Sequence, residues 1–261
     1  MNFTPYLRSF LMGPVFIVLT LVLSILGICL SYGMDSFRRQ RKVMKIWGRW
    51  TCFLFGVQVQ TRGLENWPYK SGGVVLFNHT SFFDIFAMVG FLPDMRFGAK
   101  RELFSIPFFG WAMKRAGILP IDRARRDHVY QIYEQSTHRL KSGEKIALAP
   151  EGERTRTPWT LQNFKAGPFL FALSAEVDLI PVIVCGAHQV MNKDQLIPNR
   201  KQLNSLITLD VLPALSTEGF RSDNRKALQD HVRSIMQNKL DEIKGAGTSH
   251  GKGHGILSEP S

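Results

Sequence analysis

Cysteine is scarce in this sequence. Its 261 residues include three cysteines, Cys29, Cys52 and Cys185, which are odd in number and widely spaced. Such cysteines form neither a disulfide framework nor a metal-ligand cluster. We therefore expect the folded domain to lie in a reducing compartment, and we expect neither a metal nor a cofactor.

Acidic residues are also few. Asp and Glu number 21 against 33 Lys and Arg, which gives a formal net charge of +12. A basic surface of this size suits an anionic partner, and nucleic acid, anionic lipid and phosphorylated small molecules all carry negative charge. No nucleic-acid-binding motif accompanies the charge, and many of the basic residues flank an apolar segment. We therefore expect no nucleic acid partner.

Long hydrophobic runs are absent apart from one. Hydrophobic residues make up 44% of the chain, too many for a disordered protein and too few for a polytopic membrane protein. Residues 9–34 carry no charge, and the 23 residues 10–32 are dominated by Leu, Ile, Val and Phe. At about 1.5 Å per residue they can cross a hydrocarbon layer of about 30 Å. The run is too long for a signal peptide and no A-x-A site follows it, so we expect a retained membrane helix that crosses the bilayer or dips into it and returns.

Basic residues gather on one side of this run. Arg8 alone precedes it. Five basic residues follow it: Arg38, Arg39, Arg41, Lys42 and Lys45. By the positive-inside rule, the chain after residue 35 faces the cytoplasm.

The next segment has the pattern of an amphipathic helix. One helical stripe is apolar and consists of Val43, Ile46, Trp47, Trp50, Phe53 and Leu54. Another stripe is basic and consists of Arg38, Lys42, Lys45 and Arg49. This pattern suits a helix in the headgroup region of a membrane, although the apolar stripe could instead pack on the domain core. Both hold if the helix lies between the core and the bilayer.

Strand-like and helix-like segments alternate after residue 56. The expected strands are 57–61, 73–77, 95–98, 118–121, 145–149, 180–184 and 206–212. The expected helices are 84–91, 102–116, 125–141, 166–175 and 223–243. The alternation predicts an α/β fold with a mostly parallel central sheet flanked by helices. We expect a membrane anchor with an interfacial helix over 1–56, a catalytic domain over 57–244 and a disordered tail over 245–261.

A polar turn follows the apolar strand 73–77. It contains His79, and Asp84 lies five residues further on, where a helix begins. An imidazole can take a proton from a hydroxyl at neutral pH, and a carboxylate on its other nitrogen fixes the tautomer. The two residues therefore form a candidate catalytic pair. The alternative is that Asp84 caps the helix and His79 is an ordinary turn residue.

Two further strands also end in polar turns. After strand 145–149, Gly152 permits a tight turn, Glu151 can accept from a hydroxyl, and Arg154 offers a forked donor set that matches phosphate. Arg123 follows strand 118–121 in the same way. Ligands bind at the carboxyl edge of such sheets, so we expect these side chains to line one basic cleft. The alternative for 150–156 is a solvated charged loop.

These segments resemble four ordered blocks of the glycerolipid acyltransferase family. The N-H-x-S-x-x-D block is matched by Asn78, His79, Ser81 and Asp84, the I-D-R block by Ile121, Asp122 and Arg123, the P-E-G-T-R block by Pro150, Glu151, Gly152 and Arg154, and the late apolar-Pro block by Ile180, Pro181 and Val182. The order and spacing agree over roughly residues 57–215. In one departure, Glu153 stands where the family usually has Thr, and this carboxylate repels a phosphate unless it pairs with Arg154 or Arg156.

The resemblance implies transfer of an acyl group from acyl-CoA or acyl-carrier protein to the hydroxyl of a lysophospholipid, 1-acylglycerol 3-phosphate, giving phosphatidic acid at a membrane. His79 would be the general base and Asp84 its orienting carboxylate. The substrate-binding residues would be Asn78, Ser81, Arg123, Glu151, Gly152 and Arg154. Two alternatives stay open: a different acceptor, such as glycerol 3-phosphate or another lysophospholipid, and an inactive membrane-tethered lipid-binding protein.

Overall fold

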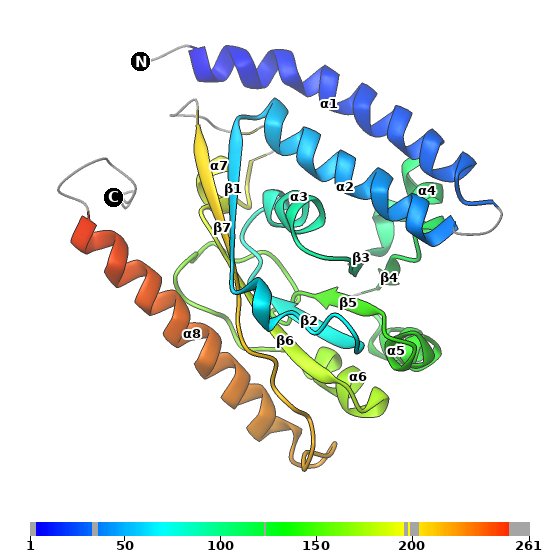
Figure 1. Cartoon of the computed structure of the whole chain (residues 1–261), viewed down its shortest axis with the longest axis vertical. Coiled ribbons are helices and arrows are strands. Elements are labelled where there is room, and N and C mark those ends of the chain that lie inside the picture. Colours follow the sequence, from blue (N-terminus) through cyan, green and yellow to red (C-terminus); the bar gives the residue numbers. More distant parts are fainter. Residues whose placement is uncertain (1–3, 33–35, 123, 196–197, 199–203, 251–261) are drawn as a thin grey trace.

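A seven-stranded sheet with helices on both faces forms the centre of the molecule (Figure 1). The computed structural model describes residues 4–32, 36–122, 124–195, 198 and 204–250. The strands are β1 (Val57–Arg62), β2 (Gly73–Phe77), β3 (Arg96–Lys100), β4 (Leu119–Ile121), β5 (Lys145–Leu148), β6 (Asp178–Cys185) and β7 (Ser205–Val211). The helices are α1 (Thr4–Cys29), α2 (Ser36–Leu54), α3 (Phe82–Phe91), α4 (Phe109–Arg115), α5 (Arg126–Lys141), α6 (Gly167–Ala175), α7 (Ala187–Val190) and α8 (Arg225–His250), with 3-10 turns η1 (Leu64–Asn66) and η2 (Arg101–Ser105). The predicted fold class is confirmed.

The direction of the strands decides where a ligand site can form. The order in the sheet is β1-β7-β6-β2-β5-β3-β4. Strands β6, β2, β5, β3 and β4 are parallel, whereas β7 is antiparallel to β6 and β1 is parallel to β7. The carboxyl ends of β2, β5 and β6 therefore meet at one edge.

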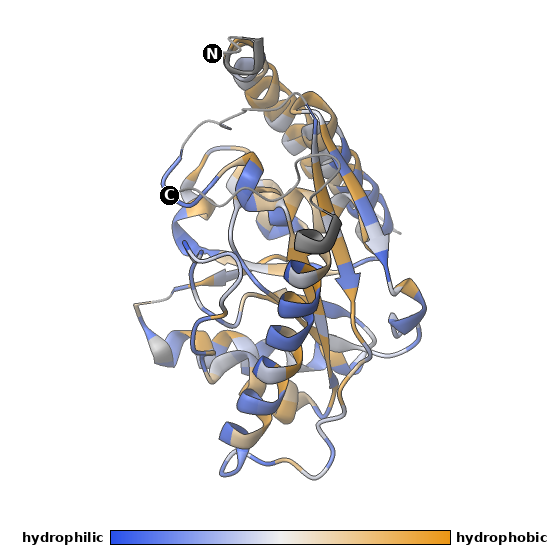
Figure 2. Cartoon of the chain, turned by 90° about the vertical axis from the view of Figure 1, so that its left-hand side faces the viewer, coloured by the Kyte–Doolittle hydropathy of each residue, from blue (hydrophilic) through white to orange (hydrophobic). Residues whose placement is uncertain are grey.

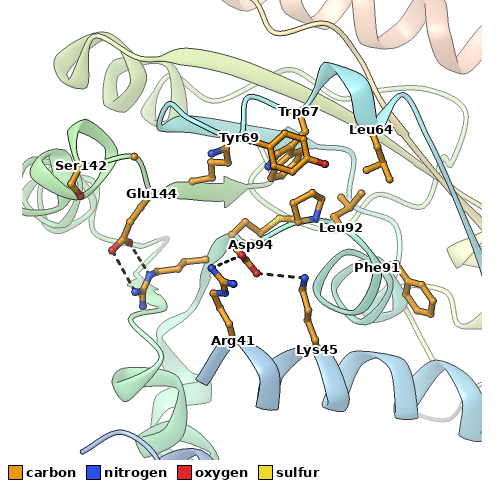
Figure 3. A pocket seen from close by; sticks show the side chains of 15 residues that line it. Arg41, Lys45, Leu64, Trp67, Tyr69, Phe91, Leu92, Asp94, Ser142 and Glu144 are labelled. Carbon is orange, nitrogen blue, oxygen red and sulfur yellow. Dashed lines mark hydrogen bonds and ion pairs between the residues drawn. The ribbon is translucent and has the colours of Figure 1, made fainter. Parts of the chain in front are cut away.

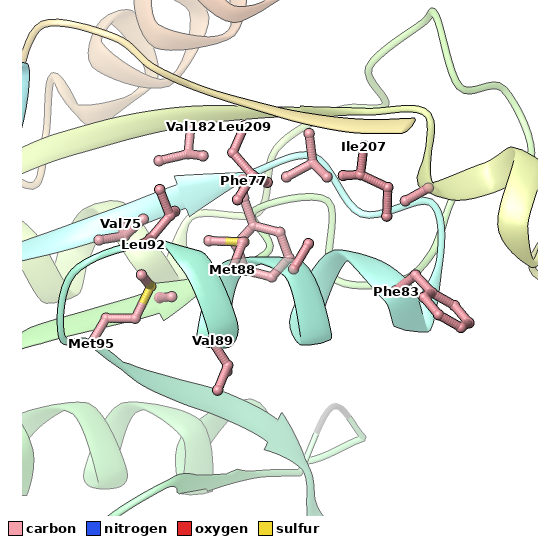
Figure 4. Packing of buried hydrophobic residues seen from close by; sticks show 14 of the residues in the cluster. Val75, Phe77, Phe83, Met88, Val89, Leu92, Met95, Val182, Ile207 and Leu209 are labelled. Atoms are coloured by element: carbon pink, nitrogen blue, oxygen red, sulfur yellow. The ribbon is translucent and has the colours of Figure 1, made fainter. Parts of the chain in front are cut away.

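Strand β2 is buried on both sides because helices cover both faces of the sheet. Val75 and Phe77 pack in the core on the α3 face, shown in Figure 4. Val74 and Leu76 pack in the core on the opposite face, under α5, α6 and α8. In Figure 2 the strands are mostly orange, whereas the long helix α8 in front of them also carries blue positions. Strand β2 thus has the continuous apolar sequence that is typical of a strand in a parallel sheet covered on both faces.

Helix α2 packs tightly on α3 at two glycines. A Cβ on Gly48 would lie 2.6 Å from the carbonyl oxygen of Phe86, and one on Gly90 would lie 2.9 Å from the backbone nitrogen of Arg49. Further along α2, Cys52 is fully buried in the core that α3 also lines. Helix α2 therefore packs on the domain core, which is the alternative that the sequence left open beside a position in the headgroup region.

Helix α1 runs antiparallel to α2 along its side (Figure 1). Near its start, Arg8 donates to the carbonyl oxygens of Leu54 and Phe53 at 3.2 and 3.1 Å. Further along, Thr20 accepts a hydrogen bond from Trp47 Nε1 at 3.0 Å. The stretch Leu7–Cys29 is long and apolar enough to cross a membrane, and only 11% of its most apolar part is buried. The predicted apolar helix is present, and it leaves most of its surface without protein contacts.

Two predicted elements differ from the structure. The expected helix over 102–116 is divided into η2 and α4. Pro107 lies between them and cannot donate the backbone hydrogen bond that a continuous helix needs. Helix α8 continues to His250, so it extends into the segment 245–261 for which the sequence predicts a disordered tail. Residues 251–261 lie outside the described residues.

Candidate active site

His79 and Asp84 meet at the turn between β2 and α3. The distance from His79 Nδ1 to Asp84 Oδ2 is 2.9 Å, and Asp84 is fully buried. The same oxygen accepts from the backbone nitrogens of Thr80 at 2.7 Å and Ser81 at 2.9 Å. Ser81 Oγ in turn accepts from the backbone nitrogen of Phe83 at 3.1 Å, which completes a capping box. Asp84 is thus both the partner of His79 and a capping residue of α3.

This geometry selects the tautomer of a neutral His79 ring. Asp84 Oδ2 already accepts from two backbone N–H groups, so it is held as an acceptor facing Nδ1. The proton of a neutral ring then lies on Nδ1, and Nε2 keeps its lone pair. The side chain of His79 is 11% exposed, so a small part of the ring reaches the surface. The arrangement can accept a proton at Nε2 and stabilise the resulting imidazolium through Asp84.

The loop after β5 holds the backbone of His79. Glu151 Oε1 accepts from the backbone nitrogen of His79 at 3.2 Å, and Glu151 Oε2 accepts from that of Gln162 at 3.0 Å. The backbone nitrogen of Thr155 donates to the carbonyl oxygen of His79 at 2.8 Å. Burial raises the pKa of Glu151, while the two backbone donors act in the opposite direction. The Glu151 carboxylate therefore joins two turns at the base of the site.

Asn78 binds the neighbouring strand. Its amide donates to the carbonyl oxygen of Val184 and accepts from the nitrogen of the same residue, both at 2.8 Å. Gly152 has a φ of 82°, and a Cβ there would lie 3.3 Å from Lys165 Cγ. The polar groups of Asn78, Ser81 and Glu151 are thus directed at backbone atoms, and these residues shape the turns that carry the site.

Arg154 places a cation beside the turn that carries His79. Its guanidinium carbon lies 4.1 Å from the centre of the Phe82 ring. Its Nη1 is buried and has no hydrogen-bond partner among the described residues. Burial lowers the pKa of Arg154, while the charges of Asp84 and Asp194 act in the opposite direction. A guanidinium with an unused donor at this position suits a phosphate.

Two ion pairs connect the 150–156 loop to the segment after α7. Glu153 pairs with Lys193 at 2.7 Å. Arg156 binds Asp194 through two nitrogens, at 2.8 and 2.9 Å. Glu153, the residue that departs from the family pattern, therefore has an ion-pair partner, Lys193, that the sequence motifs did not predict. Lys193 and Asp194 lie outside all four blocks, so no signal in the sequence pointed to them.

The third predicted turn is described only in part. Arg123 lies outside the described residues. Its neighbour Asp122 pairs with Arg101 at 3.0 Å and with Arg125 at 3.3 Å. The structure thus brings together the residues of the first and third blocks and leaves the position of Arg123 as a prediction.

A second histidine lies at the same edge of the sheet. His188, on α7, packs its ring edge-on against Trp159, with centroids 6.1 Å apart. Burial lowers its pKa, and Asp84 acts in the opposite direction. The four blocks did not include it.

Comparisons with known proteins relate this chain to acyltransferases. The family model described as "Acyltransferase" matches residues 58–185. The 1-acyl-sn-glycerol-3-phosphate acyltransferase alpha of Mus musculus is 30% identical over 239 residues, which cover 90% of this chain and 81% of that protein. The 1-acyl-sn-glycerol-3-phosphate acyltransferase of Escherichia coli K12 is 31% identical over 193 residues, covering 73% and 76%. The crystal structure of the 1-acyl-sn-glycerophosphate acyltransferase PlsC from Thermotoga maritima is similar with a TM-score of 0.76 at 22% identity, covering 93% of this chain and 96% of that one.

Proposed function

Because the chain belongs to the 1-acyl-sn-glycerol-3-phosphate acyltransferase family and is a glycerolipid acyltransferase, we propose that its acceptor is 1-acylglycerol 3-phosphate, its donor is an acyl thioester and its product is phosphatidic acid. The observation that carries this proposal is the buried His79–Asp84 pair beside the cation of Arg154. It places a base that can take the proton of a hydroxyl beside a cation that can bind a phosphate. The donor is acyl-CoA or acyl-carrier protein.

In the proposed mechanism, His79 acts as the general base. Its Nε2 removes the proton from the acceptor hydroxyl while the hydroxyl oxygen attacks the thioester carbonyl. Asp84 keeps the ring oriented and stabilises the imidazolium. The tetrahedral intermediate then expels the thiolate, which takes up a proton, and a new ester bond replaces the thioester. No acyl-enzyme is formed.

The remaining site residues have two kinds of role in this proposal. Arg154 binds the phosphate of the acceptor, and Arg123 is proposed to assist it. Asn78, Ser81, Glu151 and Gly152 keep the two turns in the conformation that presents the site, since their contacts are to backbone or depend on a positive φ. We therefore place these four residues in the substrate site as shaping residues.

We further propose that the first two helices attach the enzyme to a membrane. Helix α1 exposes a long apolar surface, and on α2 the side chains of Ile46, Trp50 and Phe53 are exposed beside basic residues. A lysolipid could then enter the site with its chain still in the bilayer. The basic residues after α1 favour a cytoplasmic position for the catalytic domain.

An acceptor and donor panel tests the proposed substrates. Purified protein would be incubated with acyl-CoA or acyl-carrier protein and with lysophosphatidate, glycerol 3-phosphate or lysophosphatidylcholine. We expect phosphatidate from lysophosphatidate, at a rate at least tenfold above that with the other acceptors. A preference for glycerol 3-phosphate would replace the proposed acceptor, and no transfer to any acceptor would indicate a lipid-binding protein.

Substitution of the catalytic pair tests the mechanism. We expect His79→Ala and Asp84→Asn each to reduce kcat by about a thousandfold or more, with the double variant little worse than either, because the two residues act as a unit. Thermal unfolding separates their structural roles. His79→Ala should unfold near the wild-type temperature, whereas Asp84→Ala should lose about 1 kcal/mol or more because it removes a helix cap. Multiplicative losses of kcat in the double variant would contradict the shared role.

A further inference from the structure

A cavity lined by charged and apolar residues lies at the opposite edge of the sheet from His79. It has a volume of about 500 Å³, and Arg96 and Lys145, which line it, are the first residues of β3 and β5. His79 lies two residues after the last residue of β2, which is parallel to β5. The cavity is thus separated from the proposed active site by the length of the strands. Its size is in the usual range for small-ligand sites.

Helix α2 forms one wall of this cavity, as Figure 3 shows. Arg41 and Lys45, one turn apart on α2, both point toward Asp94, which lies in the turn between α3 and β3. Trp67 and Tyr69 lie across the cavity from them. The cavity is therefore built from the helix that we propose to lie next to the membrane and from the edge of the sheet.

Positive charge exceeds negative charge in the lining. Four cationic residues, Arg41, Lys45, Arg96 and Lys145, face two carboxylates. Each carboxylate is already shared between two cations. Asp94 contacts Arg41 and, at 3.5 Å, Lys45. Glu144 contacts Arg96 and Arg139, both at 2.8 Å.

The two lysines in the lining, Lys45 and Lys145, have N–H donors that are not used. Lys145 is 5% exposed, and its Nζ donates to the carbonyl oxygen of Ser71 at 2.6 Å. It forms no ion pair within the described part of the chain, and burial lowers its pKa. Among the residues that the structure describes, Lys45 has one ion-pair contact, with Asp94 at 3.5 Å. Since an ammonium carries three N–H donors, both can bind a further acceptor.

We propose that this cavity binds a phosphomonoester group between Lys45 and Lys145. The surplus of two positive charges matches a phosphate dianion, and the spare ammonium donors match its oxygens. The ester is carried by a lipid headgroup or by a soluble molecule. A bound phosphate would connect α2 to the first residue of β5. The proposal is independent of the reaction at His79.

Lysine protection tests this site without an activity assay. The protein in detergent micelles, with Arg154→Ala to silence the proposed phosphate site at the catalytic turn, would be acetylated with an N-hydroxysuccinimide ester. Mass spectrometry would follow each lysine. We expect phosphatidate in the micelles or glycerol 3-phosphate in solution to slow acetylation of Lys45 at least threefold. Lys42 lies on the same helix, is exposed and does not line the cavity, so its rate should not change.

The two probes and two variants decide the outcome. Equal protection by both probes indicates that the phosphate ester alone is recognised, and protection by phosphatidate only indicates a lipid-borne headgroup. Lys145→Met should abolish the protection, and Lys145→Arg should retain it and show that the position tolerates substitution. Phosphatidylcholine should not protect. Equal slowing of Lys42 and Lys45, or protection that survives in Lys145→Met, would overturn the proposal.

Discussion

Asp84 performs its two tasks with a single oxygen. Oδ2 accepts from His79 and from two backbone N–H groups at the start of α3. The sequence left open whether this residue caps a helix or orients a base; the structure shows that it caps α3 and contacts His79, and its role in orienting a base stays a proposal. A carboxylate that is fixed by the helix start also fixes the ring that it binds.

Arg154 is the residue that we expect to distinguish acceptors. Arg154→Ala should raise the KM for lysophosphatidate by about tenfold or more, since a charge-assisted hydrogen bond contributes about 1.5–3 kcal/mol. The KM for the acyl donor should change little. Steady-state kinetics with lysophosphatidate and with a phosphate-free monoacylglycerol provide the measurement. Arg156→Ala is the matched control, because Arg156 is already paired with Asp194. Equal weakening toward both acceptors would contradict a phosphate role for Arg154.

Glu153 is expected to modulate the same site through Lys193. Glu153→Thr removes the carboxylate partner of the Lys193 ammonium, so it should lower the KM for lysophosphatidate by about two- to fivefold, an effect limited by solvent screening of an exposed pair. In the double variant that carries both Glu153→Thr and Lys193→Ala, the KM should return to near the wild-type value. If instead the natural acceptor has a larger cationic or hydroxyl-rich head, Glu153→Thr will raise the KM for that acceptor and spare lysophosphatidate. An unchanged KM for every acceptor would show that the pair does not affect binding.

At the scale of the elements, the packing of α2 on α3 depends on residue size. Gly48→Ala should reduce the free energy of unfolding by about 1–3 kcal/mol, because its Cβ would lie 2.6 Å from the carbonyl oxygen of Phe86. Helix propensity alone predicts the opposite sign, by about 1 kcal/mol. Denaturant unfolding measures the difference. Gly13→Ala on α1 is the matched control, since nothing lies within 4 Å of its Cβ, and it should not destabilise. Equal effects of the two substitutions would rule out close packing as the reason for Gly48.

The elements also show what could be predicted from the sequence. The alternation of apolar runs located all seven strands of the described sheet to within about two residues. The signal was clearest for β2 and β5, in which every residue is buried. The helix over 102–116 was wrong, although Pro107 was a visible signal against it. The antiparallel pairing of β6 and β7 could not be predicted, since strand direction depends on which neighbours a strand finds after folding.

The contact between His79 and Asp84 could be predicted because it is local in the chain. The two residues are five positions apart, across a turn where a strand leads into a helix. The bonds of Glu151 to the backbone of His79, 72 positions away, and of Glu153 to Lys193 depend on the order of the strands. Side chains that bind distant backbone atoms look the same in the sequence as side chains that bind a ligand.

At the scale of the whole molecule, the three cysteines provide a test of the native packing. Cys29 is exposed, whereas Cys52 and Cys185 are buried, and burial raises the pKa of Cys185 to about 12. With that pKa the Cys185 thiol is ionised to about one part in ten thousand at pH 8, so it should not react. We expect iodoacetamide to label one cysteine in the folded protein in detergent and three after denaturation, as counted by intact mass. Rapid labelling of Cys185 in the folded protein would contradict the described core.

If the first two helices attach to a membrane as we propose, the bonds from Arg8 to the carbonyl groups of Phe53 and Leu54 determine on which side of it the N-terminal segment lies. Leu54 ends α2 and β1 begins at Val57, so Arg8 lies close to the point in the chain where the first strand of the sheet begins. While these bonds are intact, the beginning of α1 and the strands must face the same aqueous compartment. An epitope fused ahead of α1 would therefore be reached by an antibody only from the side of the bilayer on which phosphatidate is made.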